Sequence, residues 1–208
     1  MENNTTCKVV LVGNAGVGKT CIIERYIHDT YNPESETTIT SSNNYKVVNF
    51  DEYNQSISFD IWDTAGQEVY RALAKNFYLN ASIGILVYDI TRKDSFDELQ
   101  NYWYEQLKQS GEENMVFAVV GNKSDLFSKE EVKEEEGKKF AQSINAFFIL
   151  TSCQESIGIN ELFYNCGVKY LERNKLIEVK PKDNIVLGKD NNENETGNAN
   201  GKKKKRRC

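Results

Sequence analysis

Residues 13–20 read Gly13-Asn14-Ala15-Gly16-Val17-Gly18-Lys19-Thr20 and fit the pattern G-x-x-x-x-G-K-[ST]. They directly follow the apolar run Val9–Val12, so the pattern lies where a strand turns into a helix. In such a loop glycines let backbone N–H groups turn inward onto phosphate oxygens, the lysine reaches the β- and γ-phosphates, and the hydroxyl binds Mg²⁺. The residues expected to contact a nucleotide here are Asn14, Ala15, Gly16, Val17, Gly18, Lys19, Thr20 and Cys21.

Apolar runs that alternate with amphipathic segments predict an α/β fold around this loop. The runs are Val9–Val12, Ile57–Trp62, Ile83–Tyr88, Met115–Val120 and Phe147–Leu150. Residues with helical spacing lie between or after them, in the groups Ile22–Ile27, Phe96–Leu107 and Ile159–Tyr170. This alternation predicts a mostly parallel sheet covered by helices on both faces, with ligand loops at the carboxyl ends of the strands.

A second motif, Asn122-Lys123-Ser124-Asp125, follows the run Met115–Val120 and predicts which base is bound. A carboxylate such as Asp125 can accept hydrogen bonds from N1–H and the 2-amino group of guanine, whereas adenine has no such pair of donors. Asn122 can brace the neighbouring loops, and the aliphatic stem of Lys123 can lie along the purine. The motif therefore favours guanine nucleotides.

The third motif is Trp62-Asp63-Thr64-Ala65-Gly66-Gln67-Glu68, at the end of the run that begins at Ile57. Asp63 is placed to hold a metal ion through water, and the N–H group of Gly66 to contact a γ-phosphate. Gln67 is the candidate catalytic residue, because a glutamine in this motif orients the attacking water in Ras-type GTPases.

From about Cys7 to Glu172 the chain resembles a Ras-superfamily small GTPase, and within that superfamily the Rab family. The Rab-like segments are Trp62–Glu68, Gly84–Thr91, Asp94–Phe96, Trp103 and Asn122–Asp125. The resemblance implies a P-loop small G domain with a six-stranded sheet over residues 1–173. It also implies a GTP/GDP switch that needs Mg²⁺, hydrolyses GTP to GDP and phosphate, and recruits effectors in vesicle traffic.

The same resemblance assigns further residues by motif. Thr38 matches the switch threonine, which binds Mg²⁺ together with Thr20 and Asp63 and contacts the γ-phosphate through its N–H group. Tyr31 matches the aromatic that stacks on guanine. The residues that match the loop whose backbone N–H groups contact guanine O6 are Ser152, Cys153 and Gln154.

The last 35 residues, 174–208, are expected to form a flexible tail. Asp190–Gly201 is rich in Asn, Glu and Gly, which predicts disorder, and the basic run Lys202–Arg207 precedes a terminal Cys208. The chain as a whole has a net charge of −5, so a basic end on an acidic body argues against nucleic-acid binding and for anionic lipid. Prenylation of Cys208 beside the basic run is the functional hypothesis. A solvated basic tail or a nuclear-localisation signal is the alternative.

The cysteine and histidine content narrows the class of protein further. The five cysteines have neither zinc-site nor disulfide spacing, and no signal peptide or apolar span of membrane length is evident. This pattern predicts a reducing, cytosolic setting. The single histidine, His28, lies near the end of the first expected helix, where a surface side chain is expected rather than a ligand or base, so a histidine-dependent mechanism is excluded.

The family implies a monomer in the cytosol and on the cytoplasmic face of endomembranes, with four kinds of partner. These are a nucleotide exchange factor, a GTPase-activating protein, a GDP dissociation inhibitor or escort protein, and effectors. Two alternatives stay open. A non-hydrolysing GTP-binding membrane scaffold is suggested by the polar segment Thr40–Asn43 and by Gln154 in place of lysine. Rab proteins usually read Ile-Gly-x-x-Phe where this chain reads Ile39-Thr40-Ser41-Ser42-Asn43. An ATP-using P-loop kinase or ATPase is the other, and Asp125 argues against it.

Overall fold

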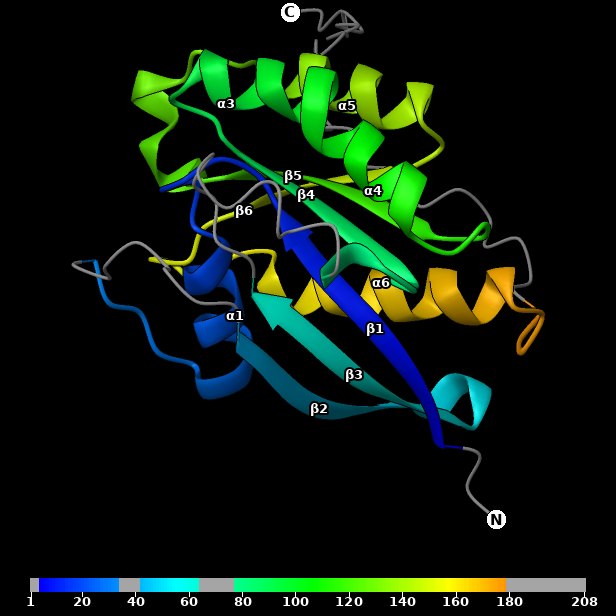
Figure 1. Ribbon diagram of the computed structural model, residues 1–208. Helices are drawn as coiled ribbons and strands as arrows, with labels where there is room; N and C mark the ends of the chain where they lie inside the picture. Colours follow the sequence, from blue (N-terminus) through cyan, green and yellow to red (C-terminus); the bar gives the residue numbers. More distant parts are fainter. Residues whose placement is uncertain (1–3, 34–41, 64–76, 179–208) are drawn as a thin grey trace, which may run out of the picture. The chain divides into compact units, whose positions relative to one another are not determined.

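A six-stranded sheet forms the centre of the structure, a computed structural model that describes residues 4–33, 42–63 and 77–178 (Figure 1). The strand order is β2-β3-β1-β4-β5-β6; β2 pairs antiparallel with β3, and the other four pairings are parallel. The strands are β1 Asn4–Val12, β2 Ser42–Phe50, β3 Gln55–Asp63, β4 Ile83–Asp89, β5 Val116–Asn122 and β6 Phe147–Thr151. The expected mostly parallel sheet is confirmed.

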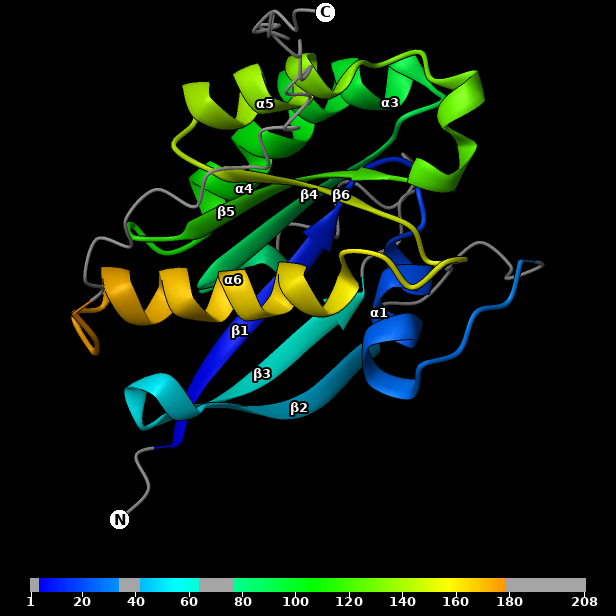
Figure 2. The same cartoon turned by 180° about the vertical axis from the view of Figure 1, so that it is seen from behind.

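Helices cover both faces of this sheet, as the alternating pattern predicts (Figure 2). On one face lie α1 (Lys19–His28) and α6 (Ile159–Arg173); on the other lie α3 (Lys93–Glu98), α4 (Tyr104–Ser110) and α5 (Glu134–Ser143). The described ranges also contain the short helices η1 Asp51–Tyr53, η3 Leu99–Trp103 and η4 Ser124–Lys129.

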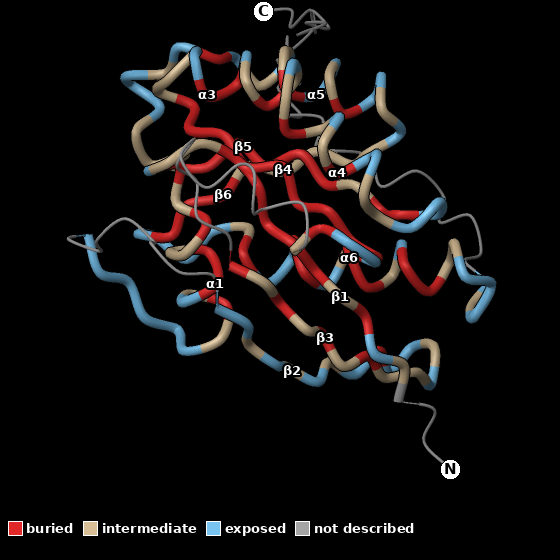
Figure 3. The backbone as a smooth tube through the Cα atoms, viewed as in Figure 1, coloured by how far each residue is buried: buried red, intermediate tan, exposed pale blue. Residues whose placement is uncertain are grey.

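The core is divided into two hydrophobic layers by the alternation of side chains along the strands. In β1, Val9 and Leu11 pack toward the α1/α6 layer, and Val10 and Val12 toward the layer that contains Trp103. All four β1 residues are fully buried, and the central strands are buried along most of their length (Figure 3). A strand buried on both faces needs a continuous apolar run, which is why β1 was visible in the sequence.

One strand, β2, has no corresponding apolar run. It lies at the edge of the sheet, and Tyr45 and Val47 remain 65% and 59% exposed. Ser42 and Asn43 of the polar segment form its beginning, opposite Asp63 and Trp62 of β3, while residues 40 and 41 lie outside the described part of the chain. An edge strand with little burial requires few apolar residues, so hydrophobic patterning does not reveal it.

A π-helical turn, η3, joins α3 to α4. The N–H group of Tyr104 bonds to the carbonyl of Leu99, five residues earlier, instead of four as in an α-helix. Within this wider turn Leu99 and Trp103 are buried, and Phe96 and Leu107 are buried on either side of it. The turn thus keeps the expected apolar stripe on the sheet.

The described residues contain no helix that is long and apolar enough to cross a membrane. Among them, Cys7, Cys21, Cys153 and Cys166 are not joined in disulfides. The structure describes the chain as far as Glu178, so the basic run and Cys208 lie outside it.

Candidate nucleotide-binding site

The described parts of the predicted motifs lie at one edge of the sheet, where parallel strands end. The phosphate loop follows β1, and the loops that begin at Asp89, Asn122 and Thr151 follow β4, β5 and β6. Because these strands are parallel neighbours, their carboxyl ends meet at this edge.

Glycines give the phosphate loop a backbone shape that other residues resist. Gly13, Gly16 and Gly18 have φ values of 147°, 75° and 98°. A Cβ atom on Gly13 would lie 2.1 Å from the carbonyl oxygen of Val87, and one on Gly18 would lie 2.3 Å from Nδ2 of Asn122. The loop therefore packs directly against β4 and against the second motif, and its shape suits a phosphate cradle.

Lys19 is held inside this loop. It is 5% exposed, and its Nζ donates to the carbonyl oxygens of Gly13 at 2.8 Å and Asn14 at 3.0 Å. Burial lowers the pKa of Lys19 to about 8, and the negative charge of Asp63 acts in the opposite direction. An ammonium group fixed here is ready to meet phosphate oxygens.

Two candidate metal ligands contact each other beside the loop. Thr20, the second residue of α1, donates from Oγ1 to Oδ2 of Asp63 at 2.8 Å, and Asp63 ends β3 with only 3% exposure. A hydroxyl and a carboxylate are the hard oxygen donors that suit Mg²⁺. The third candidate ligand, Thr38, lies outside the described residues, as do Gly66 and Gln67.

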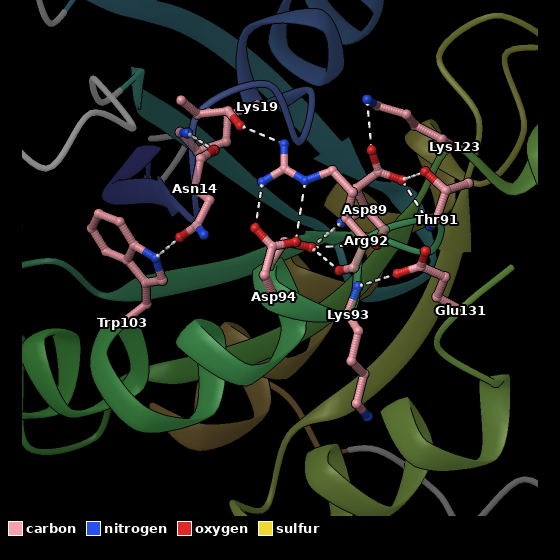
Figure 4. A network of polar contacts seen from close by, with 12 residues as sticks. Asn14, Lys19, Asp89, Thr91, Arg92, Lys93, Asp94, Trp103, Lys123 and Glu131 are labelled. Carbon is pink, nitrogen blue, oxygen red and sulfur yellow. Dashed lines mark hydrogen bonds and ion pairs between the residues drawn. The ribbon is translucent and has the colours of Figure 1, made fainter.

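The segment after β4 supports the phosphate loop from outside (Figure 4). Nη1 of Arg92 donates to the carbonyl oxygen of Ala15 at 3.1 Å, while the same guanidinium bonds to Asp94 at 3.2 and 3.3 Å. Nε1 of Trp103 donates to Oδ1 of Asn14 at 2.7 Å. Sequence analysis missed the role of Arg92 and this contact of Trp103, because neither residue stands at a motif spacing.

Asn122 joins the phosphate loop to the loops after β5 and β6, which we call the base-side loops. Its Nδ2 donates to the carbonyl oxygen of Val17 at 2.8 Å, and its Oδ1 accepts from Oγ1 of Thr151 at 3.0 Å. Nearby, Oγ of Ser152 donates to Oδ1 of Asp125 at 2.6 Å. The loops after β5 and β6 are thus fixed to each other and to the phosphate loop.

Lys123 is held by a buried carboxylate that sequence analysis did not single out as a site residue. Its Nζ lies 2.7 Å from Oδ2 of Asp89, whose side chain is 2% exposed (Figure 4). The N–H and hydroxyl groups of Thr91 donate to the other oxygen of Asp89, at 2.9 and 2.7 Å. Lys123 itself has a left-handed backbone, with φ at 66°. These contacts fix the stem of Lys123 beside the guanine motif.

Tyr31 and Cys153 lie near each other on the base side, and Arg25 contacts both. Nε of Arg25 donates to the carbonyl oxygen of Cys153 at 2.9 Å, and its Cζ lies 5.9 Å from the centre of the Tyr31 ring. Burial raises the pKa of Tyr31, and nearby Cys21, Asp125 and Cys153 raise it further. Cys153 is buried, whereas Gln154 beside it is exposed. The structure therefore groups Tyr31 with the loops that follow β5 and β6.

Comparisons with known proteins agree with this arrangement of motifs. The family model described as "Ras: Ras family" matches residues 8–172. "Ras-related protein Rab-22A" of Canis lupus familiaris and of Homo sapiens are each 45% identical over 156 residues, which cover 75% of this chain and 79% of each relative. The protein of the same name from Mus musculus is 44% identical over the same share of both chains.

Proposed function

The chain belongs to the Rab family of Ras-type small GTPases, and on this premise we propose that it is a GTP/GDP switch that hydrolyses GTP and recruits effectors in vesicle traffic. The observation that carries the proposal is the bond from Asn122 to the carbonyl of Val17. This bond joins a phosphate-binding loop to a guanine-reading loop in one site.

Guanine selectivity is assigned to Asp125. Its Oδ1 accepts a hydrogen bond from Ser152, which fixes the carboxylate and leaves acceptor capacity on both oxygens. N1–H and the 2-amino group of guanine match that capacity, whereas adenine does not. Tyr31 would stack on the base, and the backbone N–H groups of Ser152, Cys153 and Gln154 would contact its O6.

The phosphate side supplies charge and position. Lys19 would bind the β- and γ-phosphates, and Thr20, Thr38 and Asp63 would hold Mg²⁺, which neutralises phosphate charge when bound. Gly66 would contact the γ-phosphate and Gln67 would orient the attacking water.

Intrinsic turnover is expected to be slow. Within the described residues, Arg92 is the arginine that touches the phosphate loop, and it is engaged by Asp94 and by a backbone carbonyl. We therefore expect turnover on the order of 10⁻⁴–10⁻² s⁻¹, which a GTPase-activating protein accelerates by supplying an arginine.

The remaining partners follow from the family and from the tail. A nucleotide exchange factor, a GDP dissociation inhibitor or escort protein, and effectors would bind a monomer in the cytosol or on the cytoplasmic face of endomembranes. The C-terminal segment, residues 174–208, would attach the domain to these membranes through prenylated Cys208 and the basic run Lys202–Arg207.

Single-turnover GTP hydrolysis by the wild type and by Gln67→Leu tests the proposal. We expect slow phosphate release from the wild type, at least several-fold slower release from the variant, and tight GTP binding by both. Equal rates with tight GTP binding would instead indicate a non-hydrolysing GTP-binding membrane scaffold. In a competition binding assay, tighter binding of ATP than of GTP would contradict the guanine assignment.

A further inference from the structure

Arg25 connects two parts of the site that are far apart in the sequence. It lies in α1, and its Nε donates to the carbonyl oxygen of Cys153, 128 residues later, at 2.9 Å. Its Nη1 donates to the carbonyl oxygen of Asp29 at 2.9 Å and to Oδ1 of the same residue at 3.2 Å. One guanidinium therefore joins the loop after β6 to the end of α1.

The burial of the two charged partners shows where this contact acts. The side chain of Arg25 is 14% exposed, whereas that of Asp29 is 85% exposed. The ion pair with Asp29 is thus a surface contact, and such pairs contribute little. The bond to Cys153 is part-buried and is made by a charged donor, so it is the stronger restraint.

The chemistry of the peptide unit makes this restraint relevant to base recognition. The Cys153 carbonyl, held by Arg25, belongs to the peptide whose N–H group comes from Gln154. A donor on the carbonyl polarises the peptide and fixes its plane, so the N–H group keeps one direction. In the proposed site that N–H group is one of those offered to guanine O6.

We propose that Arg25 is a positioning residue for guanine recognition, which fixes the Cys153–Gln154 peptide relative to the end of α1 and thereby aims the O6-binding loop. The inference rests on the proposed function, because it assumes that a guanine nucleotide occupies the site. Arg25 also lies 5.9 Å from the Tyr31 ring, within the range of a cation–π contact, so it orders both sides of the base.

The test compares the release of GDP with that of 6-thio-GDP, from the full chain at pH 7. In 6-thio-GDP a sulfur atom, a weak acceptor, replaces O6, while N1–H and the 2-amino group remain. In Arg25→Ala we expect GDP release to accelerate by about tenfold, the factor for one hydrogen bond from a charged donor. Release of 6-thio-GDP should accelerate much less, so the difference between the two nucleotides shrinks.

Three variants serve as controls. Asp29→Asn removes the exposed carboxylate but keeps the backbone carbonyl, and it should leave both release rates within about twofold of the wild type. Arg92→Ala loosens the phosphate side and should accelerate both nucleotides by the same factor. Arg25→Lys keeps the charge but cannot donate to Cys153 and Asp29 at the same time with a planar guanidinium. Its GDP release rate should lie between those of the wild type and of Arg25→Ala, and it provides a test if the alanine variant folds poorly.

The outcomes separate this inference from the proposed function. If the wild type binds GDP tightly and Arg25→Ala and Arg25→Lys accelerate both nucleotides equally, the positioning role is wrong while the switch function stands. If the wild type binds neither nucleotide, the proposed function itself is wrong, and the inference fails with it.

Discussion

The lysine of the phosphate loop and the side chains that fix the base-side loops make contacts of different range. Lys19 bonds to carbonyls only 6 and 5 residues away, within its own loop. On the base side, Ser152 bonds to Asp125 over 27 residues, and Arg25 to Cys153 over 128. The lysine of the phosphate loop is thus held by local contacts, to which Arg92, Trp103 and Asn122 add long-range ones, whereas these two base-side bonds form only when distant segments are brought together by the fold.

This difference predicts different consequences for substitutions. A change on the base side should alter which base is preferred, and a change on the phosphate side should weaken all nucleotides alike. Asn122 connects the two sides, because its side chain bonds both to Val17 in the phosphate loop and to Thr151 on the base side. Substitutions at Asn122 or at residues packed against it should affect both the base preference and the overall nucleotide affinity.

The largest expected effect is on the base side, in Asp125→Asn. The charged acceptor of two hydrogen bonds, at about 2 kcal/mol each, is replaced by an amide whose N–H₂ group faces the 2-amino group of guanine, so GDP affinity should fall by about a thousandfold. Xanthosine diphosphate should recover much of the loss, because its carbonyl at C2 accepts from the new amide. Competition binding measures both, with Asp97→Asn, a surface substitution, as the control. An equal loss of affinity for GDP and for xanthosine diphosphate would show that a base-side substitution does not act through base preference.

Gly18→Ala should disturb the packing of Asn122 against the phosphate loop and weaken nucleotide binding by about a hundredfold. Alanine at φ 98° is strained, and its Cβ would displace the Asn122 amide from 2.3 Å, so the bond to Val17 is lost as well. Gly16→Ala is the matched control: its φ of 75° brings strain, but its Cβ meets only Nη1 of Arg92, at 3.7 Å. GDP release rates of the two variants give the difference, and equal rates would show that contact with Asn122 is unimportant.

The smallest expected effect is the pH dependence of nucleotide affinity that Lys19 causes on the phosphate side. The pKa of Lys19 is about 8 in the structure, and bound phosphates should raise it because they stabilise the ammonium. Below pH 8 Lys19 is charged with or without nucleotide, whereas above pH 8 binding requires proton uptake, so affinity falls as pH rises. Between pH 7 and 8.5 the decrease should be about fourfold.

Titration calorimetry in two buffers of different ionisation enthalpy measures this proton uptake directly. Lys19→Met should bind GDP weakly at every pH and show no uptake from this group. A proton uptake that persists in Lys19→Met would assign the titration to another residue and show that Lys19 does not cause the pH dependence of nucleotide affinity.

The sequence predicted the locally built parts of the molecule well and the assembled parts less well. The buried strands and the three helical stripes were predicted because burial imposes a periodicity. The edge strand β2 was missed by this criterion, since its exposed side chains impose none. Thr38, Gly66, Gln67 and Cys208 lie outside the described residues, so their roles stay predictions.

Within the site, the supporting residues were the hardest to predict. Asp89, Arg92 and Arg25 act on partners in other loops, and a single aspartate or arginine has no spacing that marks it. Their partners are in two cases backbone carbonyls, Ala15 and Cys153, which any residue type supplies. Such contacts become visible only when the distant segments are placed together.

The π-helical turn between α3 and α4 has a consequence for insertions and deletions. A turn that closes over five residues holds one residue more than an α-helical turn, so it is equivalent to a single-residue insertion in a helix. Deleting one residue from Leu99–Trp103 should let this turn close as an ordinary α-helical turn, so that Leu107 keeps its place on the sheet. Deleting one residue from α4 before Leu107 would instead rotate Leu107 by about 100° away from the sheet, because no wide turn is there to absorb the change. The π-helical turn is therefore the place in this helix where a change of length by one residue is tolerated.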